Sequence, residues 1–170
     1  MKFEQNYFII IALLGAILLL TYYNFIHSGI DNAELLWGRI KDNLRKMYYV
    51  SMLITAISFI LILYYLFLTN SLDYNNSLQI LMTICAIIIL SMFWMPISLK
   101  YLIVKLDKYK ILITAILFFV ALASLLLAIE LYKINEKKYK TQKNIAFAAA
   151  IYFFFHTFVL DTIVWTQHFF

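Results

Sequence analysis

The sequence is poor in the residues that end helices or cross-link a chain. Its 170 residues include one proline, three glycines and one cysteine, Cys85. With so little Pro and Gly, loops must be few, and most of the chain is expected to be helical. A single cysteine excludes an intramolecular disulfide and a cysteine-based metal cluster.

Charge is scarce as well: 14% of the residues are charged, 65% are hydrophobic, and the mean hydropathy is +0.86. Such a composition excludes a soluble globular domain, and long unbroken apolar runs exclude the alternating strands of a membrane β-barrel. The net charge of +5 does not indicate nucleic-acid binding, because every Lys and Arg lies between or before the apolar runs. We therefore predict an all-α, polytopic transmembrane helical bundle that is integral to a membrane, with the lipid bilayer as partner and no nucleic acid.

Five apolar segments are each long enough to cross a bilayer, which takes about 20 residues of helix. The spans are expected at residues 7–26, 47–69, 78–99, 111–132 and 145–168 of a single membrane domain over residues 1–170. Pro96, near the end of the third span, is expected to bend or break its helix. Five spans place the N-terminus and the second and fourth loops on one side, side A. The first and third loops and the C-terminus lie on side B.

The first loop has a helical pattern of its own. Asp31 and Glu34 have the spacing of a capping box, and apolar residues recur after them at helical intervals. This pattern predicts an amphipathic helix over 31–46 that lies in the membrane interface. The alternative is a simple N-terminal extension of the second span, because periodicity does not separate the two. The residues that define the predicted interfacial helix are Trp37, Ile40 and Leu44 on its apolar face, with Arg39, Arg45 and Lys46 outside that face.

Two spans carry small polar residues suited to contact between helices. Ser51, Thr55 and Ser58 share one face of the second span and form a predicted interhelical hydrogen-bonding edge. Ser124 and Ala128 give the fourth span a pair of small residues four positions apart, which favours close approach of another helix.

The last span carries the ionisable residues that lie deepest in the predicted membrane, His156 and Asp161. Charged groups at this depth are costly, so by default they mark a functional site. On an α-helical wheel Asp161 shares a face with Trp165 and His168, whereas His156 points roughly the opposite way. The two are therefore not expected to form a pair within one helix.

Asp161 has no Lys or Arg at its own depth. It is expected either to be protonated and hydrogen-bonded, or to be reached by a side-B base such as Arg45, Lys46 or Lys100. The candidate residues for binding a ligand or handling a proton are Asp161, His156, Trp165, Trp94 and His168. No catalytic residue, cofactor or metal site is assigned, because no motif of a known phosphate loop, hydrolase or metalloprotease is present.

Three functions remain open at this point. The favoured one is a non-catalytic structural or interaction component of a membrane, with other membrane proteins or a second copy of the chain as candidate partners. The first alternative is a binder or transporter of a small molecule or lipid, with a side-B cavity lined by Trp94, Asp161 and Trp165. The second is a membrane-bound lipid-modifying enzyme that uses His156 or Asp161 as its acid or base.

The five-span layout and the length resemble those of the tryptophan-rich sensory protein family of membrane ligand binders. The resemblance is confined to architecture. The Trp- and Pro-rich first loop of that family is missing, since this loop has Trp37 alone and no proline between Ile26 and Met47. No residue role is taken over from the family.

Overall fold

The computed structural model describes residues 5–27, 32–69 and 74–170, and within them the chain is all-α. Five helices are long and apolar enough to cross a membrane, which confirms the predicted number of spans. The helices are α1 (Gln5–His27), α2 (Asn32–Leu35), α3 (Asp42–Leu68), α4 (Tyr74–Val104), α5 (Asp107–Lys133), α6 (Lys140–Phe155), the π-helix η1 (His156–Trp165) and α7 (Thr166–Phe169).

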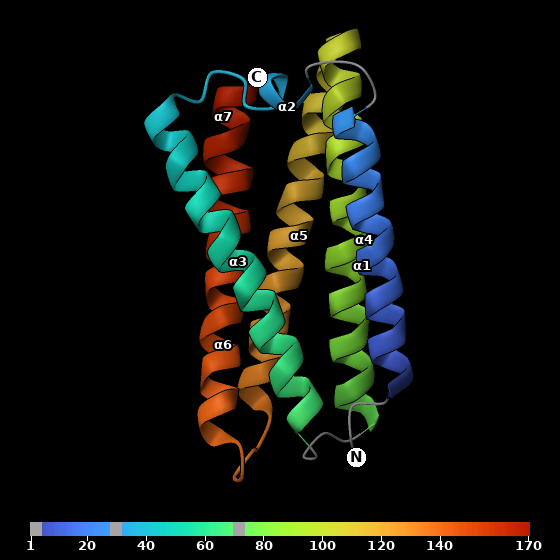
Figure 1. The fold of residues 1–170 in the computed structure, drawn as a ribbon, viewed down its shortest axis with the longest axis vertical. Helices are drawn as coiled ribbons and strands as arrows, with labels where there is room; N and C mark the ends of the chain where they lie inside the picture. Colours follow the sequence, from blue (N-terminus) through green and yellow to red (C-terminus); the bar gives the residue numbers. More distant parts are fainter. Residues whose placement is uncertain (1–4, 28–31, 70–73) are drawn as a thin grey trace.

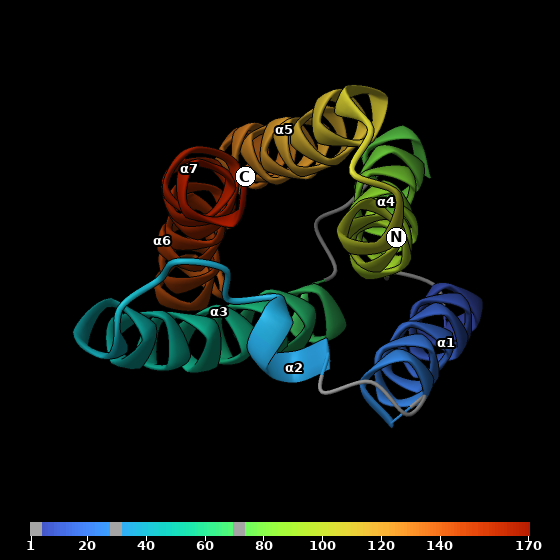
Figure 2. The ribbon, with the colours of Figure 1, turned by 90° about the horizontal axis from the view of Figure 1, so that it is seen from above.

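The long helices run alternately up and down, and α1 begins at the end of the bundle opposite to the one at which α7 ends (Figure 1). Seen from above, α4, α5, α6 and α3 follow one another around the molecule, with η1 and α7 continuing α6 (Figure 2). Helix α1 lies outside this ring and packs on α4. The last span therefore has neighbours on two sides, α3 and α5, and it is the span that carries His156 and Asp161.

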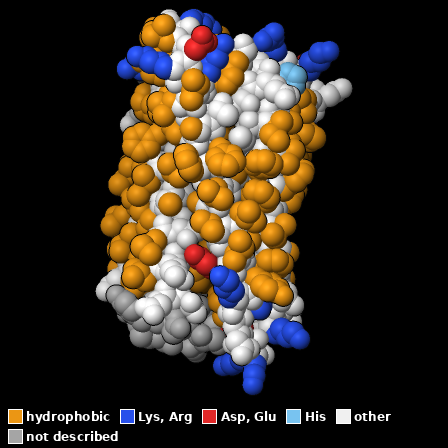
Figure 3. Space-filling model, turned by 180° about the vertical axis from the view of Figure 1, so that it is seen from behind, with side chains coloured by type: hydrophobic (Ala, Val, Ile, Leu, Met, Phe, Trp, Pro, Cys, Tyr) orange, Lys and Arg blue, Asp and Glu red, His pale blue; other side chains and the backbone are white. Residues whose placement is uncertain are grey.

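The buried apolar residues form two clusters. The larger one includes Ile62 and Leu66 of α3, Ile84 of α4 and Ala146 and Ala150 of α6. The second lies around the side-B end of the last span and includes Tyr48, Leu160 and Trp165. Apolar side chains also cover the outside of the bundle between two ends that carry Lys and Arg (Figure 3), as expected for a surface that faces lipid.

The helix of the third span does not break at Pro96. Helix α4 continues through this proline to Val104. The expectation of a break was wrong, because loss of one backbone hydrogen bond at a proline is not enough to end a helix that packs along its length on α5.

The predicted interfacial helix over 31–46 is also wrong in extent. Asp31 lies outside the described residues, α2 ends at Leu35, and the next helix begins at Asp42. Between them Gly38 has φ +54°, and the Lys41 backbone is extended, so a continuous helix is excluded. Glu34 forms an ion pair of 2.8 Å with Arg45. The alternative, an N-terminal extension of the second span, holds for residues 42–46 only.

The segment between α2 and α3 instead crosses the side-B end of the last span. The backbone N–H of Arg39 donates to the His168 carbonyl at 2.9 Å, and Trp165 Nε1 donates to the Leu36 carbonyl at 2.9 Å. A side chain at Gly38 would lie 2.6 Å from the His168 carbonyl oxygen. The first loop is therefore held against the last span by hydrogen bonds to backbone carbonyl groups.

Candidate functional site

The last span changes its helix type at His156. In the π-helix η1 each backbone N–H bonds to the carbonyl five residues earlier, where an α-helix uses the carbonyl four residues earlier. The Thr162 hydroxyl follows the same register and donates to the Thr157 carbonyl at 2.8 Å. Residues five apart are thus stacked above one another, and the wider turn changes which side chains share a face.

This register brings His156 and Asp161 together. Their Nε2 and Oδ2 atoms are 3.6 Å apart, an ion-pair distance whenever the imidazole is protonated. The expectation that the two point in opposite directions was wrong, because it assumed α-helical rotation through a segment that is a π-helix. π-Helical segments are rare; most are single turns within α-helices, and these are frequent at functional sites.

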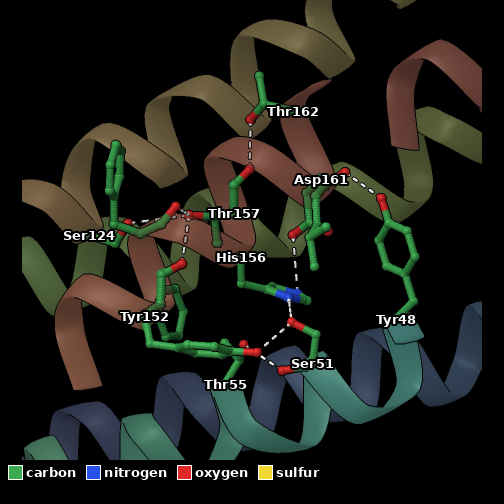
Figure 4. A network of polar contacts seen from close by, with 12 residues as sticks. Tyr48, Ser51, Thr55, Ser124, Tyr152, His156, Thr157, Asp161 and Thr162 are labelled. Carbon is green, nitrogen blue, oxygen red and sulfur yellow. Dashed lines mark hydrogen bonds and ion pairs between the residues drawn. The ribbon is translucent and has the colours of Figure 1, made fainter. Parts of the chain in front are cut away.

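The other imidazole nitrogen reaches the second span. His156 Nδ1 lies 2.8 Å from Ser51 Oγ on α3, and Ser51 Oγ lies 2.8 Å from the Tyr152 hydroxyl on α6. The result is a continuous chain of polar groups, Asp161–His156–Ser51–Tyr152, which we call the polar cluster (Figure 4). It joins the last span to α3 inside the bundle, with Ser51 and His156 each only 5% exposed.

Further bonds hold the helices on each side of the polar cluster. The Tyr48 hydroxyl on α3 donates to the Leu160 carbonyl of η1, and the hydroxyls of Ser124 on α5 and Thr157 lie 3.3 Å apart. Thr55 donates to the Ser51 carbonyl at 2.8 Å within α3. Ser51, Thr55 and Ser58 of the predicted polar edge are all buried; Ser51 bonds to another helix as predicted, whereas the Thr55 bond stays within α3. The small pair on the fourth span is also buried as predicted.

The Asp161 carboxyl group has no lysine or arginine as an ion-pair partner among the described residues. Arg45 is paired with Glu34, and Lys100 lies over the ring of Tyr109. The expected approach of a side-B base to Asp161 is therefore not found. Its side chain is 29% exposed, against 7% for the side chain of His156. It interacts electrostatically with the hydroxyl groups of two tyrosines on other helices, Tyr22 and Tyr48.

The tryptophan candidates lie next to one another. Trp94 and Trp165 make an edge-to-face contact with ring centroids 5.3 Å apart, and Tyr22 contacts Trp94 from α1 at 6.1 Å. Trp165 is also stacked on Phe169 at 4.2 Å. His168, the remaining candidate, contributes its backbone carbonyl to the contact with the first loop. Trp94 and Trp165, which were expected to line a cavity with Asp161, are packed against each other.

Two hollows on the described surface lie away from these residues. One of about 590 Å³ is bordered by Lys110, Phe118 and Phe170, and one of about 20 Å³ by Gln79 and Glu130. Neither is lined by Asp161, Trp94 or Trp165. Within the described ranges no group of three His, Cys, Asp or Glu side chains is arranged to hold a metal ion.

Sequence reasoning missed two carboxylates at side A. Glu136, only 7% exposed, accepts bonds from Thr69 Oγ1 at 2.7 Å and from the backbone N–H of Lys138 at 2.7 Å. It links the end of α3 to the start of α6. Glu130 on α5 accepts a bond of 3.2 Å from Thr83 on α4. Both were visible as acids close to span ends, but nothing in the sequence indicated their partners.

Ser51, His156 and Asp161 are the residue types of a nucleophile, a base and an orienting acid, yet the geometry does not favour hydrolysis. Ser51 is buried, and its hydroxyl is already shared between His156 and Tyr152. Nucleophilic catalysis needs a substrate position next to both the nucleophile and the oxyanion donors. Neither hollow is lined by Ser51. What the cluster can do chemically is hold a proton and move it along the chain.

Comparison with known proteins adds no assignment: no family model, no curated protein and no solved structure matches this chain.

Proposed function

We propose that this chain is a multi-pass membrane protein that binds a proton in the polar cluster and passes it between Asp161 and Tyr152, without enzymatic activity. The observation that carries the proposal is that both imidazole nitrogens of His156 are engaged, Nδ1 by Ser51 at 2.8 Å and Nε2 by Asp161 at 3.6 Å. Chains of Asp, Glu and His inside spans are typical of proton-handling membrane proteins.

The cluster has two complete bonding arrangements. In one, the Tyr152 hydroxyl donates to Ser51, Ser51 donates to His156 Nδ1, and the Nε2–H points at an ionised Asp161. In the other, Asp161 is protonated and faces a bare Nε2, while Nδ1–H donates to Ser51 and Ser51 donates to Tyr152. Either atom of each hydroxyl contact can be the donor. The second arrangement holds one proton more than the first, because Tyr152 remains neutral in both. A proton that enters at the Tyr152 hydroxyl displaces the Tyr152 proton to Ser51, the Ser51 proton moves to His156 Nδ1, and the Nε2 proton moves to Asp161. One proton is thereby taken up at Tyr152 and one appears on Asp161.

The proton is favoured over a larger ligand by the packing around Asp161. Trp94 contacts both Tyr22 and Trp165 directly, and Asp161 does not line either of the two hollows described above. A proton needs no cavity. The Asp161 side chain is 29% exposed, so the packed helices do not enclose it completely.

The test is infrared spectroscopy of the protein in lipid nanodiscs during a pH titration. A protonated carboxylic acid has a carbonyl stretching band that an ionised carboxylate lacks. We expect a band in the wild type that Asp161→Asn removes and that His156→Gln shifts to a different pH. Asp107→Asn is the matched control, since Asp107 is an acid of α5 whose side chain is 87% exposed.

The outcome that overturns the proposal is a titration in which Asp161→Asn leaves every carboxyl band in place, or in which His156→Gln leaves the pH of the Asp161 band unchanged. In the first case Asp161 does not exchange a proton while the protein is folded. In the second case the histidine and the aspartate do not share one.

A second candidate function is a structural or interaction component, in which the polar cluster only fixes the last span to α3. The bonds from Tyr48 to Leu160 and from Ser51 to His156 favour it, because each joins two helices. The two functions differ in one observable. If the cluster is purely structural, no carboxyl band that changes with pH is removed by Asp161→Asn while the protein is folded.

A further inference from the structure

A hollow lies on the outside of the bundle, between α5 and the last span. Its volume is about 590 Å³, within the range of 300–1,000 Å³ that is usual for ligand sites. Ala115 and Thr162 line it together with larger side chains: Phe118 and Phe119 from α5, and Phe170 from the end of the last span. Its position is independent of the polar cluster, whose members do not line it.

The hollow belongs to the surface that faces lipid. Phe118 is 44% and Phe119 52% exposed, and both lie on a helix apolar enough to cross a membrane. The face of the molecule that carries α4 and α5 shows a broad belt of apolar side chains (Figure 3). An occupant of such a hollow must be apolar over most of its length, as an acyl chain is.

A positive charge borders the hollow at side B. Lys110 lines it and is held by an ion pair of 3.2 Å with Asp107 and by the rings of Tyr101 and Phe170 at 5.8 and 5.9 Å. Its side chain is still 37% exposed. An ammonium group has three donors, so one contact with Asp107 leaves others for an anion.

The surroundings of Lys110 add to this charge. Between α4 and the first turn of α5 the chain has four lysines and one acid, Asp107, over residues 100–110. Two of the other lysines lie over aromatic rings at the same end, Lys105 over Tyr101 at 5.2 Å and Lys108 over Tyr109 at 5.3 Å. Basic residues next to a span attract anionic headgroups by about 1 kcal/mol each.

We propose that this hollow is a binding site for one anionic phospholipid, with an acyl chain between α5 and η1 and the headgroup phosphate on Lys110. The apolar lining selects an acyl chain, and the position of Lys110 at its side-B border selects a negative headgroup. A zwitterionic lipid fits the same hollow but gains less from the lysines around it. The site therefore discriminates by headgroup charge.

Two variants separate the two halves of the site. Lys110→Gln removes the charge and keeps the length of the side chain, and Ala115→Leu fills the hollow and keeps the charge. Lys46→Gln is the matched control, because Lys46 is an exposed lysine of side B on α3, away from the hollow. Binding is measured by native mass spectrometry of the purified chain with phosphatidylglycerol or phosphatidylcholine, and inorganic phosphate is added in a separate arm.

The wild type is expected to bind phosphatidylglycerol more tightly than phosphatidylcholine. Lys110→Gln should reduce that preference about fivefold, the ratio that corresponds to ~1 kcal/mol for one basic residue. Ala115→Leu should weaken the binding of both lipids, and Lys46→Gln should change neither. Inorganic phosphate should not displace the lipid, because it cannot occupy the apolar part of the hollow.

Three results overturn the proposal. Equal binding of both lipids by the wild type means ordinary annular contact. An unchanged preference in Lys110→Gln means that the headgroup lies elsewhere. Unchanged binding in Ala115→Leu means that the lysines attract headgroups without a chain in the hollow. Infrared titration of Asp161 is a separate measurement, so failure here leaves the proposed proton binding untouched.

Discussion

The two halves of the last span contact the same two helices, α3 and α5, but are held to them in different ways. The half toward side A, α6, has alanines at the contact: Ala146 and Ala150 are completely buried and Ala149 is 7% exposed. The other half, η1, is held by hydrogen bonds from Tyr48 and Ser51 of α3. Close contact of small side chains predominates in the first half, although Tyr152 of α6 also bonds Ser51 at 2.8 Å, and polar bonds predominate in the second.

The difference shows how the contacts of a π-helix differ from those of a regular α-helix. An alanine-lined contact works with a regular helix, because small side chains let two backbones approach. The wider helix of η1 presents polar groups five residues apart and leaves carbonyls to be bonded from other helices, as the Tyr48–Leu160 bond does. The geometry of η1, which carries the candidate site, therefore depends on hydrogen bonds from neighbouring helices. The position of α6 depends mainly on the close fit of small side chains.

Enlarging a buried alanine should have the largest effect. Ala150→Leu adds a branched side chain where no space is left, and overpacking of this kind costs about 3 kcal/mol in free energy of unfolding. Ala148→Leu is the control, because Ala148 lies two positions away on the exposed side of α6. Unfolding in mixed micelles gives both values. Equal stability of the two variants would show that α6 is not held by close packing.

Gly38→Ala should have the next largest effect, because it loosens the contact of the first loop with the last span. Gly38 has φ +54°, and an added Cβ would lie 2.8 Å from the Cα of Phe169 as well as against the His168 carbonyl. A residue other than glycine in that conformation costs about 1–3 kcal/mol.

Gly15→Ala in α1 provides the control, since a Cβ there meets nothing within 4 Å. In a helix interior that change should stabilise by up to about 1 kcal/mol. The two variants should therefore shift the unfolding midpoint in opposite directions. A shift in the same direction would mean that the first loop adapts without cost.

The contrast between α6 and η1 also separates the features that the sequence could predict from those that it could not. Spans were predictable because their signal is hydrophobicity over about 20 residues, and tertiary contacts do not alter it. The polar edge at Ser51 was predictable because three small polar residues share one face of an apolar helix. The α6 half of the last span is a regular α-helix, so helical periodicity describes it correctly.

The predictions that were wrong concern segments whose structure depends on long-range contacts. The helix predicted over 31–46 had the right periodicity, but Gly38 and the His168 carbonyl decide the path of the chain there. The pairing of His156 with Asp161 requires a π-helix, which wheel analysis does not consider. Both failures lie at side B around the last span, where bonds between distant segments override local pattern.

Ser51→Ala tests the polar half directly and should have a moderate effect. It removes the group bonded to both His156 and Tyr152, so two buried polar groups lose a partner. Hydrogen bonds between membrane helices contribute ~0.6 kcal/mol on average and at most ~1.7, so we expect about 1 kcal/mol.

The control for that variant is Thr21→Ala in α1, whose hydroxyl donates within its own helix to the Ile17 carbonyl at 2.8 Å. The free energy of unfolding of the control should stay near that of the wild type. If Ser51→Ala is as stable as Thr21→Ala, the polar half of the last span is held by its apolar contacts, and the contrast with α6 disappears.

The smallest effect on stability is expected for Asp161→Asn, although the same change should abolish the proposed proton binding. Asparagine keeps the size of the side chain and one carbonyl oxygen at the position 3.6 Å from His156 Nε2. It loses only the charge, and no lysine or arginine among the described residues is paired with that charge. The free energy of unfolding should therefore fall by less than about 1 kcal/mol. Asp161→Leu should be more damaging, because it leaves the buried His156 Nε2 without a polar neighbour. Unfolding of both variants in the same micelles checks the order. An Asp161→Asn variant less stable than Asp161→Leu would mean that the ionised carboxylate, and not its shape or hydrogen bonding, holds η1 in its π-helical register.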